Sequence, residues 1–505
     1  MAGPNVIELA ARRWPDKLAR LRGGFYTIKD KTGAEIPFVM NGDQERFIAE
    51  RHGLDIVLKA RQKGFTTVIQ LDMLDDCLFR PNTSAGVIAH NLGDAEAFFA
   101  DKIKFAYDKL PDEFRAAVPA TNDTVRSLKF GNGSSIRVGT SLRSGTLQRL
   151  HVSEYGKLCA KFPEKAREVK SGAFNTVALG QQITVESTAE GHAGHFYEMT
   201  KLAQDKQKLG AELTELDFKF HFAPWWSSPE YVLSQDVNET REHQAYFEKL
   251  ETLGIVLTRQ QRAWYVKKSE EQGDDMKREY PSTAEEAFEA SVEGAYLSSQ
   301  MSKLRKEGRI CKIPVLDAPV ETSWDLGVND STAITFWQTV GMERRAIDYY
   351  ENSGEGWGHY ARVLAERGYN YARHYGPHDI AHRMMGIVAE TRQEKAEQAG
   401  IRPWEVVGRI PDEMAGVDAS RGFLAQVWID EERCSRLIQC LDNFRKEWDE
   451  IRGVWKDKYR HDEFSHGYKS LETFAVGCPV SPVKNDAATE SRMRREYAKR
   501  VQGIV

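Results

Sequence analysis

The segment "KARQKGFTT", residues 59–67, is the first in the chain whose residue types could bind a phosphate. It follows the apolar run "DIVL" and leads into "TVIQLDML", so we expect a strand, a tight turn at Gly64 and then a helix. Such a loop directs backbone N–H groups at phosphate oxygens, and the hydroxyl of Thr66 or Thr67 would bind Mg²⁺. The competing interpretation is a basic turn that only precedes a helix.

This loop lacks a positively charged residue at the position where phosphate loops usually have a lysine. Phe65 occupies the position of the lysine that normally follows the glycine, and Lys59 occupies the position of the first glycine. Arg61 and Lys63 lie upstream of the glycine, with Gln62 between them, and could reach the same phosphate oxygens from the other side of the loop. The sequence therefore leaves Lys59, Arg61 and Lys63 as alternatives.

A second group of polar residues ends the apolar run in "LQRLHVSEYG". A nucleotide hydrolase often carries two acids at this place, one that holds Mg²⁺ through water and one that polarises the attacking water. Ser153 replaces the first acid, so we expect Glu154 to be the catalytic base.

Other segments carry groups that could complete such a site. Thr188 ends the run "QQITVEST", and with Ser187 and Glu190 it could sense the γ-phosphate. Gln44 in "NGDQERF" could hydrogen-bond an adenine edge, and Arg143 in "TSLRSGT" could act as an arginine finger toward a neighbouring subunit. Each also has a purely structural interpretation, as a turn former or a solvated charge.

Three aspartates in the second half could do different chemistry. They are Asp325 in "SWDLGVNDST", Asp379 in "HYGPHDIAHR" and Asp462 in "KYRHDEFSHG". Hydrolysis of a phosphodiester by two Mg²⁺ or Mn²⁺ ions needs carboxylates that converge from separate elements, and an acid within an apolar strand is costly unless it is paired or coordinated. We expect these three acids to hold the metals, with Glu463 as a possible fourth ligand and His466 as an outer group. The alternative for each is a capping or salt-bridged acid.

The elements that must position these residues indicate an α/β protein. In the first half, short β-type runs alternate with helical stretches such as "DAEAFFADKIKFAYDKL", which is typical of a parallel sheet with crossover helices. A polar helical stretch follows from about residue 240. A second α/β unit opens with adjacent strands in "VETSWDLGVNDSTAITFWQ" and continues with helices such as "EERCSRLIQCLDNFRKEWDEI".

Composition is typical of a globular protein of two or three domains, with 505 residues, 41% hydrophobic and 29% charged. Six cysteines without a CxxC pair indicate reduced thiols rather than a zinc ribbon or disulfide framework. The net charge of -5 argues against a protein that coats nucleic acid with its whole surface and leaves room for local basic patches. No run of 18 apolar residues and no signal-type N-terminus occur, so we expect a cytoplasmic protein without membrane contact.

The order of these segments resembles the large terminase subunit of tailed bacteriophages, the ATP-driven DNA-packaging motor and nuclease. "ARQKGFTT" resembles the deviant phosphate loop of that family, "LHVSEYG" its second nucleotide motif and "STAEG" its coupling motif. "SWDLGVNDST", "PHDIAH" and "RHDEFSHG" resemble the three acidic motifs of its nuclease. The chain departs from the family at Phe65, at Ser153, and at Lys469, where many relatives carry an acid, which moves the expected third metal ligand back to Asp462.

The resemblance implies an arrangement of domains along the chain. We expect a P-loop ATPase domain of the ASCE type over residues 1–240, a helical lid or linker over 241–310, an RNase H-like nuclease domain over 311–485 and a basic tail over 486–505.

The resemblance also implies function. We expect ATP and Mg²⁺ as cofactors, with Mn²⁺ possible in the nuclease site, and double-stranded DNA, a terminase small subunit and the portal protein of a procapsid as partners. The chain would form a ring, of five subunits by family resemblance, in the cytoplasm of the infected host and outside the mature virion. The rival hypotheses are a repair or restriction helicase-nuclease and a non-catalytic DNA-binding structural protein.

Overall fold

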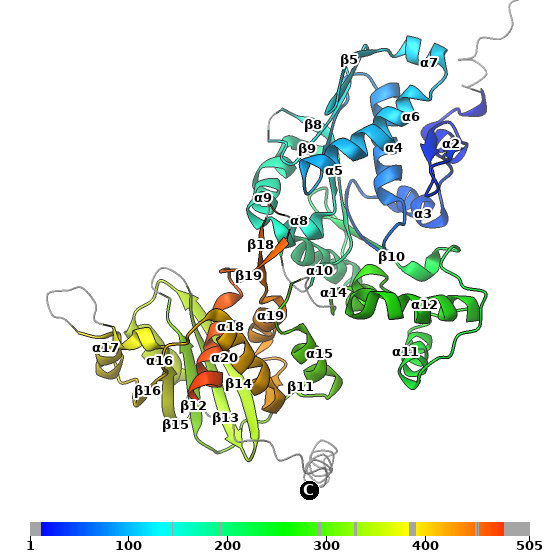
Figure 1. The fold of residues 1–505 in the computed structure, drawn as a ribbon. Helices are drawn as coiled ribbons and strands as arrows, with labels where there is room; N and C mark the ends of the chain where they lie inside the picture. Colours follow the sequence, from blue (N-terminus) through cyan, green and yellow to red (C-terminus); the bar gives the residue numbers. More distant parts are fainter. Residues whose placement is uncertain are drawn as a thin grey trace, which may run out of the picture. The chain divides into compact units, whose positions relative to one another are not determined.

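The computed structural model describes residues 12–143, 145–191, 194–289, 294–327, 331–382, 390–449, 452 and 454–478. The chain divides into two compact units, Met1–Glu293 and Gly294–Val505. Each unit is built on a mixed sheet with helices packed against it (Figure 1). The expected α/β class is therefore confirmed. Within the described ranges, no helix has both the length and the apolar character needed to span a membrane.

The sheet of the first unit has eight strands in the order β10-β3-β9-β8-β4-β7-β6-β5. Neighbouring strands run parallel from β10 to β7, and β6 and β5 continue the sheet antiparallel. The carboxyl ends of β3, β9 and β8 therefore lie side by side at one edge. The strands of this unit, with the separate β1–β2 pair, are β1 Thr27–Lys29, β2 Glu35–Pro37, β3 Leu54–Lys59, β4 Ser84–Ile88, β5 Ala120–Thr124, β6 Ser127–Phe130, β7 Ser135–Gly139, β8 Leu147–Ser153, β9 Val177–Ser187 and β10 Lys219–Ala223.

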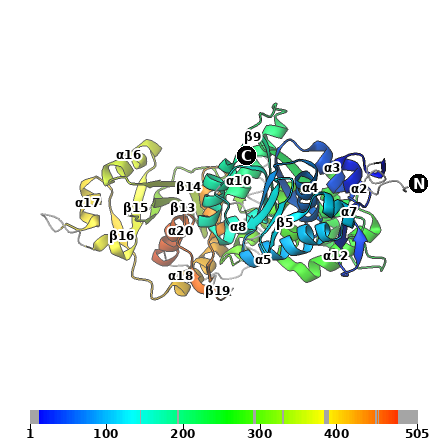
Figure 2. The same ribbon diagram turned by 90° about the horizontal axis from the view of Figure 1, so that it is seen from above.

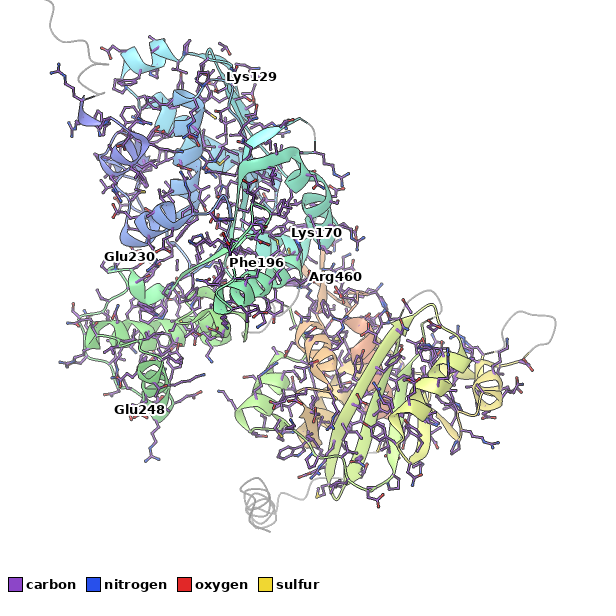
Figure 3. All side chains as sticks on the ribbon, turned by 180° about the vertical axis from the view of Figure 1, so that it is seen from behind. Lys129, Lys170, Phe196, Glu230, Glu248 and Arg460 are labelled. Carbon is purple, nitrogen blue, oxygen red and sulfur yellow. The ribbon has the colours of Figure 1, made fainter. Side chains whose placement is uncertain are left out.

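The apolar run of β3 is buried because helices cover both faces of this sheet. Successive side chains of a strand point to opposite faces, so Val57 packs in the core that contains α3 and α4, whereas Ile56 and Leu58 pack in the core that contains α8 and α10. Phe196 of α10 is buried in the second of these cores (Figure 3). The fully apolar type of strand that the sequence predicted is thus explained by two-sided burial.

The helices of the first unit include one whose charged residues are also buried. Asp75 on α4 accepts hydrogen bonds from Arg20, and Asp72 pairs with Arg149, so the acids within this core helix are compensated. The helices are α2 Lys17–Arg22, α3 Gly42–Glu50, α4 Phe65–Phe79, α5 Leu92–Phe98, the π-helix η1 Phe99–Lys104, α6 Phe105–Asp108, α7 Asp112–Ala117, α8 Tyr155–Lys161, α9 Pro163–Glu168, the π-helix η2 Val169–Ala173, the short 3₁₀ turn η3 Phe174–Thr176 and α10 His195–Lys208.

The polar helical stretch that follows β10 packs on residues 59–67, the candidate phosphate loop, in the same unit. The Tyr231 hydroxyl donates to the Arg61 carbonyl over 2.6 Å, and the Arg61 N–H donates to the Glu279 carbonyl over 2.9 Å. An aromatic cluster in which Trp225 stacks on Trp264 holds the stretch together. Its elements are η4 Trp225–Ser227, α11 Arg241–Thr252, α12 Arg259–Gln272, η5 Gly273–Asp275, α13 Met276–Glu279 and α14 Ala284–Glu289.

The second unit has a seven-stranded sheet in the order β11-β17-β14-β13-β12-β15-β16. β12, β13 and β14 form an antiparallel meander, as the adjacent strands in the sequence predicted, and β15 and β17 add to its two sides in parallel. The strands are β11 Ile310–Cys311, β12 Val320–Asp325, β13 Ser331–Val340, β14 Glu343–Ser353, β15 Tyr371–Gly376, β16 Trp404–Val406 and β17 Val427–Asp430, with a separate hairpin of β18 Lys446–Asp449 and β19 Val454–Tyr459.

Helices cover both faces of this second sheet. α18, α19 and α20 contribute to one core, where Trp337 stacks on Phe474, and α16 and α17 contribute to the core around Trp324. Seen from above, α17 lies beside β16 at the end of the sheet (Figure 2). The helices are α15 Ser298–Lys306, α16 Trp357–Arg367, η6 His378–Ala381, α17 Arg392–Gln398, α18 Glu413–Phe423, η7 Leu424–Gln426, α19 Ser435–Asn443 and α20 Ser465–Gly477.

One expected helix is shorter than the sequence indicated. The stretch "EERCSRLIQCLDNFRKEWDEI" was interpreted as one helix, but α19 ends at Asn443 and Lys446–Asp449 form β18. Phe444 leaves the helix in an extended conformation and is buried against Tyr468, with ring centroids 3.5 Å apart. Tertiary packing of this aromatic residue therefore overrides the helical pattern.

Candidate functional site

The phosphate loop is held in a conformation that brings the start of α4 to the carboxyl edge of the sheet. Gly64 has φ +73°, a left-handed conformation that favours glycine, and α4 begins at the next residue. A Cβ atom on Gly64 would lie 2.5 Å from the Gln44 Nε2 atom. Strand, turn and helix therefore follow the order that the sequence predicted, and Gln62 adds a second left-handed residue with φ +54°.

Gln44 fastens this loop and does not offer its amide to a base. Its Nε2 donates to the carbonyls of Lys63, over 3.3 Å, and Gly64, over 3.0 Å, while its Oε1 accepts from the Asn41 N–H. The residue is buried and forms a capping box with Asn41 at the start of α3. We expected an adenine contact here; in this structure the amide is used by the loop itself.

Glu186, on the strand between the phosphate-loop strand and the acidic strand, is the centre of the polar cluster. Its Oε1 accepts from the Thr66 hydroxyl over 2.8 Å and from the Ser153 hydroxyl over 2.7 Å, and it lies 3.3 Å from the His151 Nε2. Its Oε2 lies 3.1 Å from the Lys59 ammonium, which also donates to Glu154 over 3.0 Å. The sequence alone does not single out Glu186, because it lies inside an apolar run and only the pairing of β9 with β8 and β3 brings it to this site.

The charges of this cluster stabilise one another. Burial alone would raise the pKa of Glu186, but the nearby Lys59 ammonium and the hydrogen bonds of His151 and Ser153 hold the pKa of Glu186 well below its ordinary value. Burial alone would lower the pKa of Lys59, but the carboxylates of Glu154 and Glu186 raise it above its ordinary value. Both carboxylates and the ammonium are therefore charged at neutral pH.

Glu154 occupies a strained position directly after β8. Its φ of +53° is left-handed, which is rare for a residue with a side chain, and such strain concentrates at functional positions. Against the effect of burial, Lys59 lowers the pKa of Glu154, and Lys157 lies 3.3 Å from its Oε2. The carboxylate is therefore ionised and held by two cations, in the place expected for the catalytic base.

Two of the three candidate cations point away from this cluster. Lys63 is fully buried, forms an ion pair with Asp43 and donates to the Pro224 carbonyl over 2.9 Å. Arg61 is half-exposed and pairs with Glu279 of α13. In this structure each of these cations therefore compensates an acid outside the cluster, and a contact of Lys63 or Arg61 with phosphate stays a prediction.

The other hydroxyl of the loop, Thr67, contacts a cation that the sequence argument did not consider. The Lys102 Nζ donates to the Thr67 Oγ1 over 3.2 Å. Lys102 belongs to the π-helix η1, which packs against α4. It was missed because nothing in its local sequence relates it to a loop 35 residues upstream.

The remaining expected residues of this site are dispersed. Arg143 is more than half exposed and its guanidinium lies 3.4 Å from Glu168, so it does not contact the cluster in this chain. Ser187 accepts from the Gly156 N–H over 3.0 Å, and the Thr188 hydroxyl is buried without a hydrogen-bond partner in the described structure.

In the second unit, two of the expected acids follow neighbouring parallel strands. Asp325 ends β12, and Asp379 lies in η6 directly after β15. The Asp325 Oδ2 accepts a hydrogen bond from the His466 Nδ1 over 2.9 Å, and Asp379 pairs with Arg392 over 2.8 Å. Burial, together with the charge of Asp379, raises the pKa of Asp325, although His466 and Lys469 act in the opposite direction.

The third expected acid does not join them. Asp462 accepts from the Phe464 N–H over 3.0 Å, lies 3.5 Å from Arg460 and acts as a local turn cap, while Glu463 is exposed. Within the part of the chain that the structure describes, no group of three histidine, cysteine or acidic side chains could hold a metal ion. The three expected carboxylates are therefore not gathered at one point in this structure.

The sequence matches no protein-family model and no curated protein. Among solved structures, the chain is similar to the large terminase of bacteriophage HK97, with 13% identity and a TM-score of 0.40 over 91% of this chain and 99% of that one. It is also similar to the large terminase of a thermophilic bacteriophage in complex with ATP-γ-S, with 11% identity and a TM-score of 0.32 over 87% and 99% of the two chains. The nuclease domain of the bacteriophage SPP1 large terminase with bound Mn gives 17% identity and a TM-score of 0.24 over 31% and 85%.

These structural neighbours are bacteriophage large terminases. At such identities the likeness to them concerns the fold, and at such TM-scores it carries no argument about chemistry.

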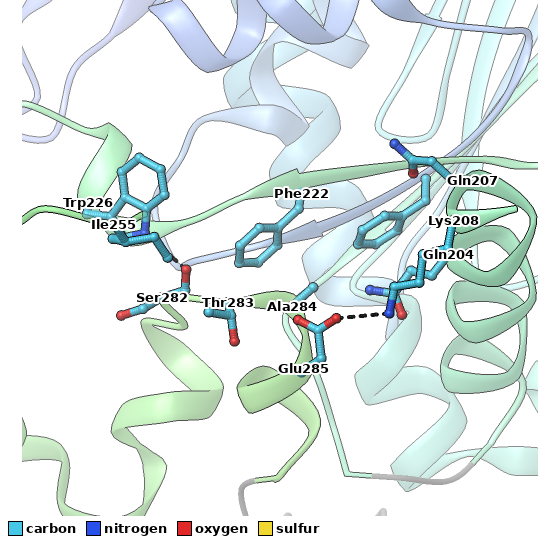
Figure 4. Close-up of a pocket in the computed structure, with 11 residues that line it drawn as sticks. Gln204, Gln207, Lys208, Phe222, Trp226, Ile255, Ser282, Thr283, Ala284 and Glu285 are labelled. Carbon is cyan, nitrogen blue, oxygen red and sulfur yellow. Dashed lines mark hydrogen bonds and ion pairs between the residues drawn. The ribbon is translucent and has the colours of Figure 1, made fainter. Parts of the chain in front are cut away.

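One pocket of the first unit lies apart from the polar cluster. This pocket, of about 480 Å³, opens between α10, β10 and the helical stretch, with Phe220, Phe222 and Trp226 on its walls and the Lys208–Glu285 ion pair at its rim (Figure 4). None of the expected phosphate-loop residues lines it. This cavity therefore does not coincide with the polar cluster that contains the chemically reactive groups.

Proposed function

We propose that the chain is a viral DNA-packaging motor subunit, a terminase large subunit with an ATPase in its first unit and a metal-dependent DNA endonuclease in its second. The observation that carries the ATPase is the cluster of Lys59, Thr66, Glu154 and Glu186, which gathers at the adjacent carboxyl ends of three parallel strands beside a glycine-turned helix start. Ligands of α/β sheets bind at this edge, and phosphates bind at such helix starts.

The donor atoms of this cluster suit Mg²⁺, which prefers oxygen ligands and keeps several waters. Thr66 supplies a hydroxyl, and the carboxylates of Glu154 and Glu186, which pair with Lys157 and Lys59, place negative charge beside it. When bound, the ion would neutralise charge on the β- and γ-phosphates. Thr66 would hold it, and the backbone N–H groups after Gly64 would bind the phosphates.

Glu154 acts on the attacking water in this proposal. Its carboxylate is ionised, accepts hydrogen bonds and is fixed by Lys59 and Lys157, so it can orient the water and accept its proton. Arg143 and Thr188 complete the proposal as an arginine finger toward a neighbouring subunit and a γ-phosphate sensor.

The ATPase is tested by phosphate release from ATP with Mg²⁺. The Glu154→Gln variant should bind ATP but lose at least about 100-fold in turnover, within the range for removal of a general base. Glu164→Gln, an exposed acid on α9, is the matched control and should turn over like the unaltered chain. Equal turnover in Glu154→Gln would overturn the assignment.

The nuclease rests on Asp325 and Asp379, which the register of β12 and β15 brings together at one sheet edge. Cleavage of linear double-stranded DNA in Mg²⁺ or Mn²⁺ should disappear in Asp325→Ala and with EDTA. The Asp462→Ala variant distinguishes the two roles considered for this residue. Loss of DNA cutting would support the role of a metal ligand, and retained cutting would support the role of a turn cap. Cutting that persists in Asp325→Ala would exclude this nuclease site.

We extend the proposal to the partners of such a motor. The chain would act on concatemeric double-stranded DNA as a ring, with a terminase small subunit for recognition and a procapsid portal as its docking site, in the cytoplasm of the host. A net charge of -5 suits a protein that must release and regrip DNA, since extensive phosphate neutralisation strengthens binding.

A further inference from the structure

Ser153 leaves the nucleotide site without the first of its two usual acids, and Glu186 reaches the same place from the next strand. Ser153 on β8 and Glu186 on β9 are direct cross-strand partners, and Glu186 is in turn the partner of Val57 on β3. Side chains of directly paired residues point to the same face of a sheet. The Glu186 carboxylate therefore lies over Ser153 and extends toward the phosphate-loop helix.

The contacts of Glu186 are those that an acid at position 153 would be needed to make. One oxygen, Oε1, accepts from both the Thr66 and Ser153 hydroxyls, so it fixes the hydroxyl that is offered to Mg²⁺. The Glu186 residue is fully buried, and burial of a carboxylate is unfavourable until its partners offset it. A serine here is compatible with a functional site only if another group supplies the charge.

We propose that Glu186 replaces the acid missing at Ser153 and, through Thr66, positions the Mg²⁺ of bound ATP. The inference rests on the proposed ATPase and deepens it. Glu186 is a positioning residue, since it acts through the Thr66 hydroxyl, and Lys59 compensates its charge together with that of Glu154.

The experiment measures the Mg²⁺ dependence of binding of a fluorescent ATP analogue to the full chain. Glu186→Gln should weaken the apparent Mg²⁺ affinity by at least about 10-fold, the usual effect of removing an outer-shell carboxylate. Adding Ser153→Asp to that variant should restore part of the affinity, because it returns an acid to the neighbouring position. Asp55→Asn is the matched control, a buried acid at the other end of the phosphate-loop strand that pairs with His221, and should leave the Mg²⁺ dependence unchanged.

Two results would overturn the proposal. One is an unchanged Mg²⁺ dependence in a folded Glu186→Gln; the other is a loss of binding that is equal with and without Mg²⁺ and that Ser153→Asp does not rescue. If Glu186→Gln does not fold, Glu186→Asp, which draws the carboxylate back by one methylene, must still weaken Mg²⁺ affinity. If the unaltered chain binds no ATP, the ATPase proposal itself fails, which is a distinguishable outcome.

A separate observation concerns the positive charge that this loop lacks because Phe65 occupies the position of the usual lysine. Lys59, Arg61 and Lys63 are each paired with a carboxylate, so their charges are already balanced. Lys102 forms no ion pair in the described ranges, although the charges of Asp101 and Glu186 act on it, and its hydrogen bond goes to Thr67, at the start of the phosphate-loop helix. Its side chain is half-buried, and burial lowers the pKa of Lys102.

We infer that Lys102 supplies the positive charge that binds the phosphates of ATP in place of the usual loop lysine. A half-buried ammonium beside a phosphate-loop hydroxyl gains a partner when a phosphate binds, whereas the three loop cations would first have to leave theirs. This inference also rests on the proposed ATPase.

The affinity of the fluorescent ATP analogue tests this second inference. Lys102→Met should weaken binding by at least about 10-fold, which is the loss expected for one charge-assisted hydrogen bond. Lys104→Met is the control, because that lysine lies in the same π-helix but is paired with Asp108 and Asp123. Affinity that is equal in Lys102→Met and the unaltered chain would overturn the inference, and no binding by the unaltered chain would instead defeat the ATPase proposal.

Discussion

Buried charges hold the phosphate loop in place at the scale of single residues. Lys63 is buried beside Asp43 and the Pro224 carbonyl, and Lys59 is buried beside Glu154 and Glu186. Removal of one member of such a pair leaves its partner charged and desolvated, which costs more than the pair contributes. The loss of either lysine should therefore have a different effect: Lys59 contacts the proposed catalytic base Glu154, whereas Lys63 contacts only groups that hold the loop.

The structural role of Lys63 gives the first prediction. Lys63→Met should destabilise the first unit by about 2–3 kcal/mol, below the usual cost of about 3–5 kcal/mol because Arg46 still pairs with Asp43. Urea denaturation measures this change. The double variant Lys63→Met/Asp43→Asn should recover part of the loss, and a Lys63→Met chain as stable as the original would refute the buried pairing.

His374 makes the stability of the second unit depend on pH. Its Nδ1 lies 2.7 Å from the Thr322 hydroxyl, and burial lowers the pKa of His374 to about 4 from its ordinary value of 6.5. Because the folded state favours the neutral ring, its contribution to stability is present above pH 6.5 and is lost as the pH falls toward 4, by roughly 3 kcal/mol in all. Denaturation of the second unit at several pH values should show this loss, and His374→Gln should flatten it.

At the scale of elements, the turn between β3 and α4 sets the direction of the phosphate-loop helix. Its geometry depends on the left-handed Gly64 and on the Gln44 amide that fills the space beside it. The same close contact that shapes the loop also leaves no room for a side chain. The turn is therefore fixed by two segments that are far apart in the sequence.

Gly64→Ala tests this account of the turn. The change should cost about 1–2 kcal/mol for the left-handed conformation alone. It should also displace Gln44 and weaken ATP binding. Gly210→Ala is a matched control with φ +62° and open space around its Cβ position, so it should show the strain without the loss of binding. Unaltered ATP binding by Gly64→Ala would contradict the proposed loop.

The elements also show how far sequence reasoning can reach. Apolar runs predicted β3, β8 and β9, because strands buried on both faces need apolar side chains. Glu186 could not be predicted from the sequence, because it lies within such a run. Only the pairing of β8 with β9 shows that it lies beside Ser153. Lys102 could not be predicted either, because it contacts Thr67 only through the packing of η1 on α4.

At the scale of the whole molecule, the chain consists of two units with separate cores and separate candidate sites. The phosphate-loop cluster belongs entirely to the first and the Asp325–Asp379 pair to the second. The proposed motor-nuclease needs both activities on one DNA, and in the proposal each activity has a sheet edge of its own.

This division predicts two responses to ligand in thermal unfolding. Saturating ATP analogue with Mg²⁺ at about 100 times its Kd should stabilise the first unit by about 2.7 kcal/mol and leave the second unchanged. Calorimetry should then show one transition that moves and one that does not. A shift of only the transition assigned to the second unit would show that the nucleotide binds there, which would contradict the proposed site.

The rate of ATP hydrolysis by the full chain, measured against the concentration of double-stranded DNA, tests the central claim most directly. The account predicts Mg²⁺-dependent turnover that rises with DNA and is lost at every DNA concentration in Glu154→Gln. Turnover that is indifferent to both DNA and the loss of the Glu154 carboxylate would contradict a DNA motor driven by this site.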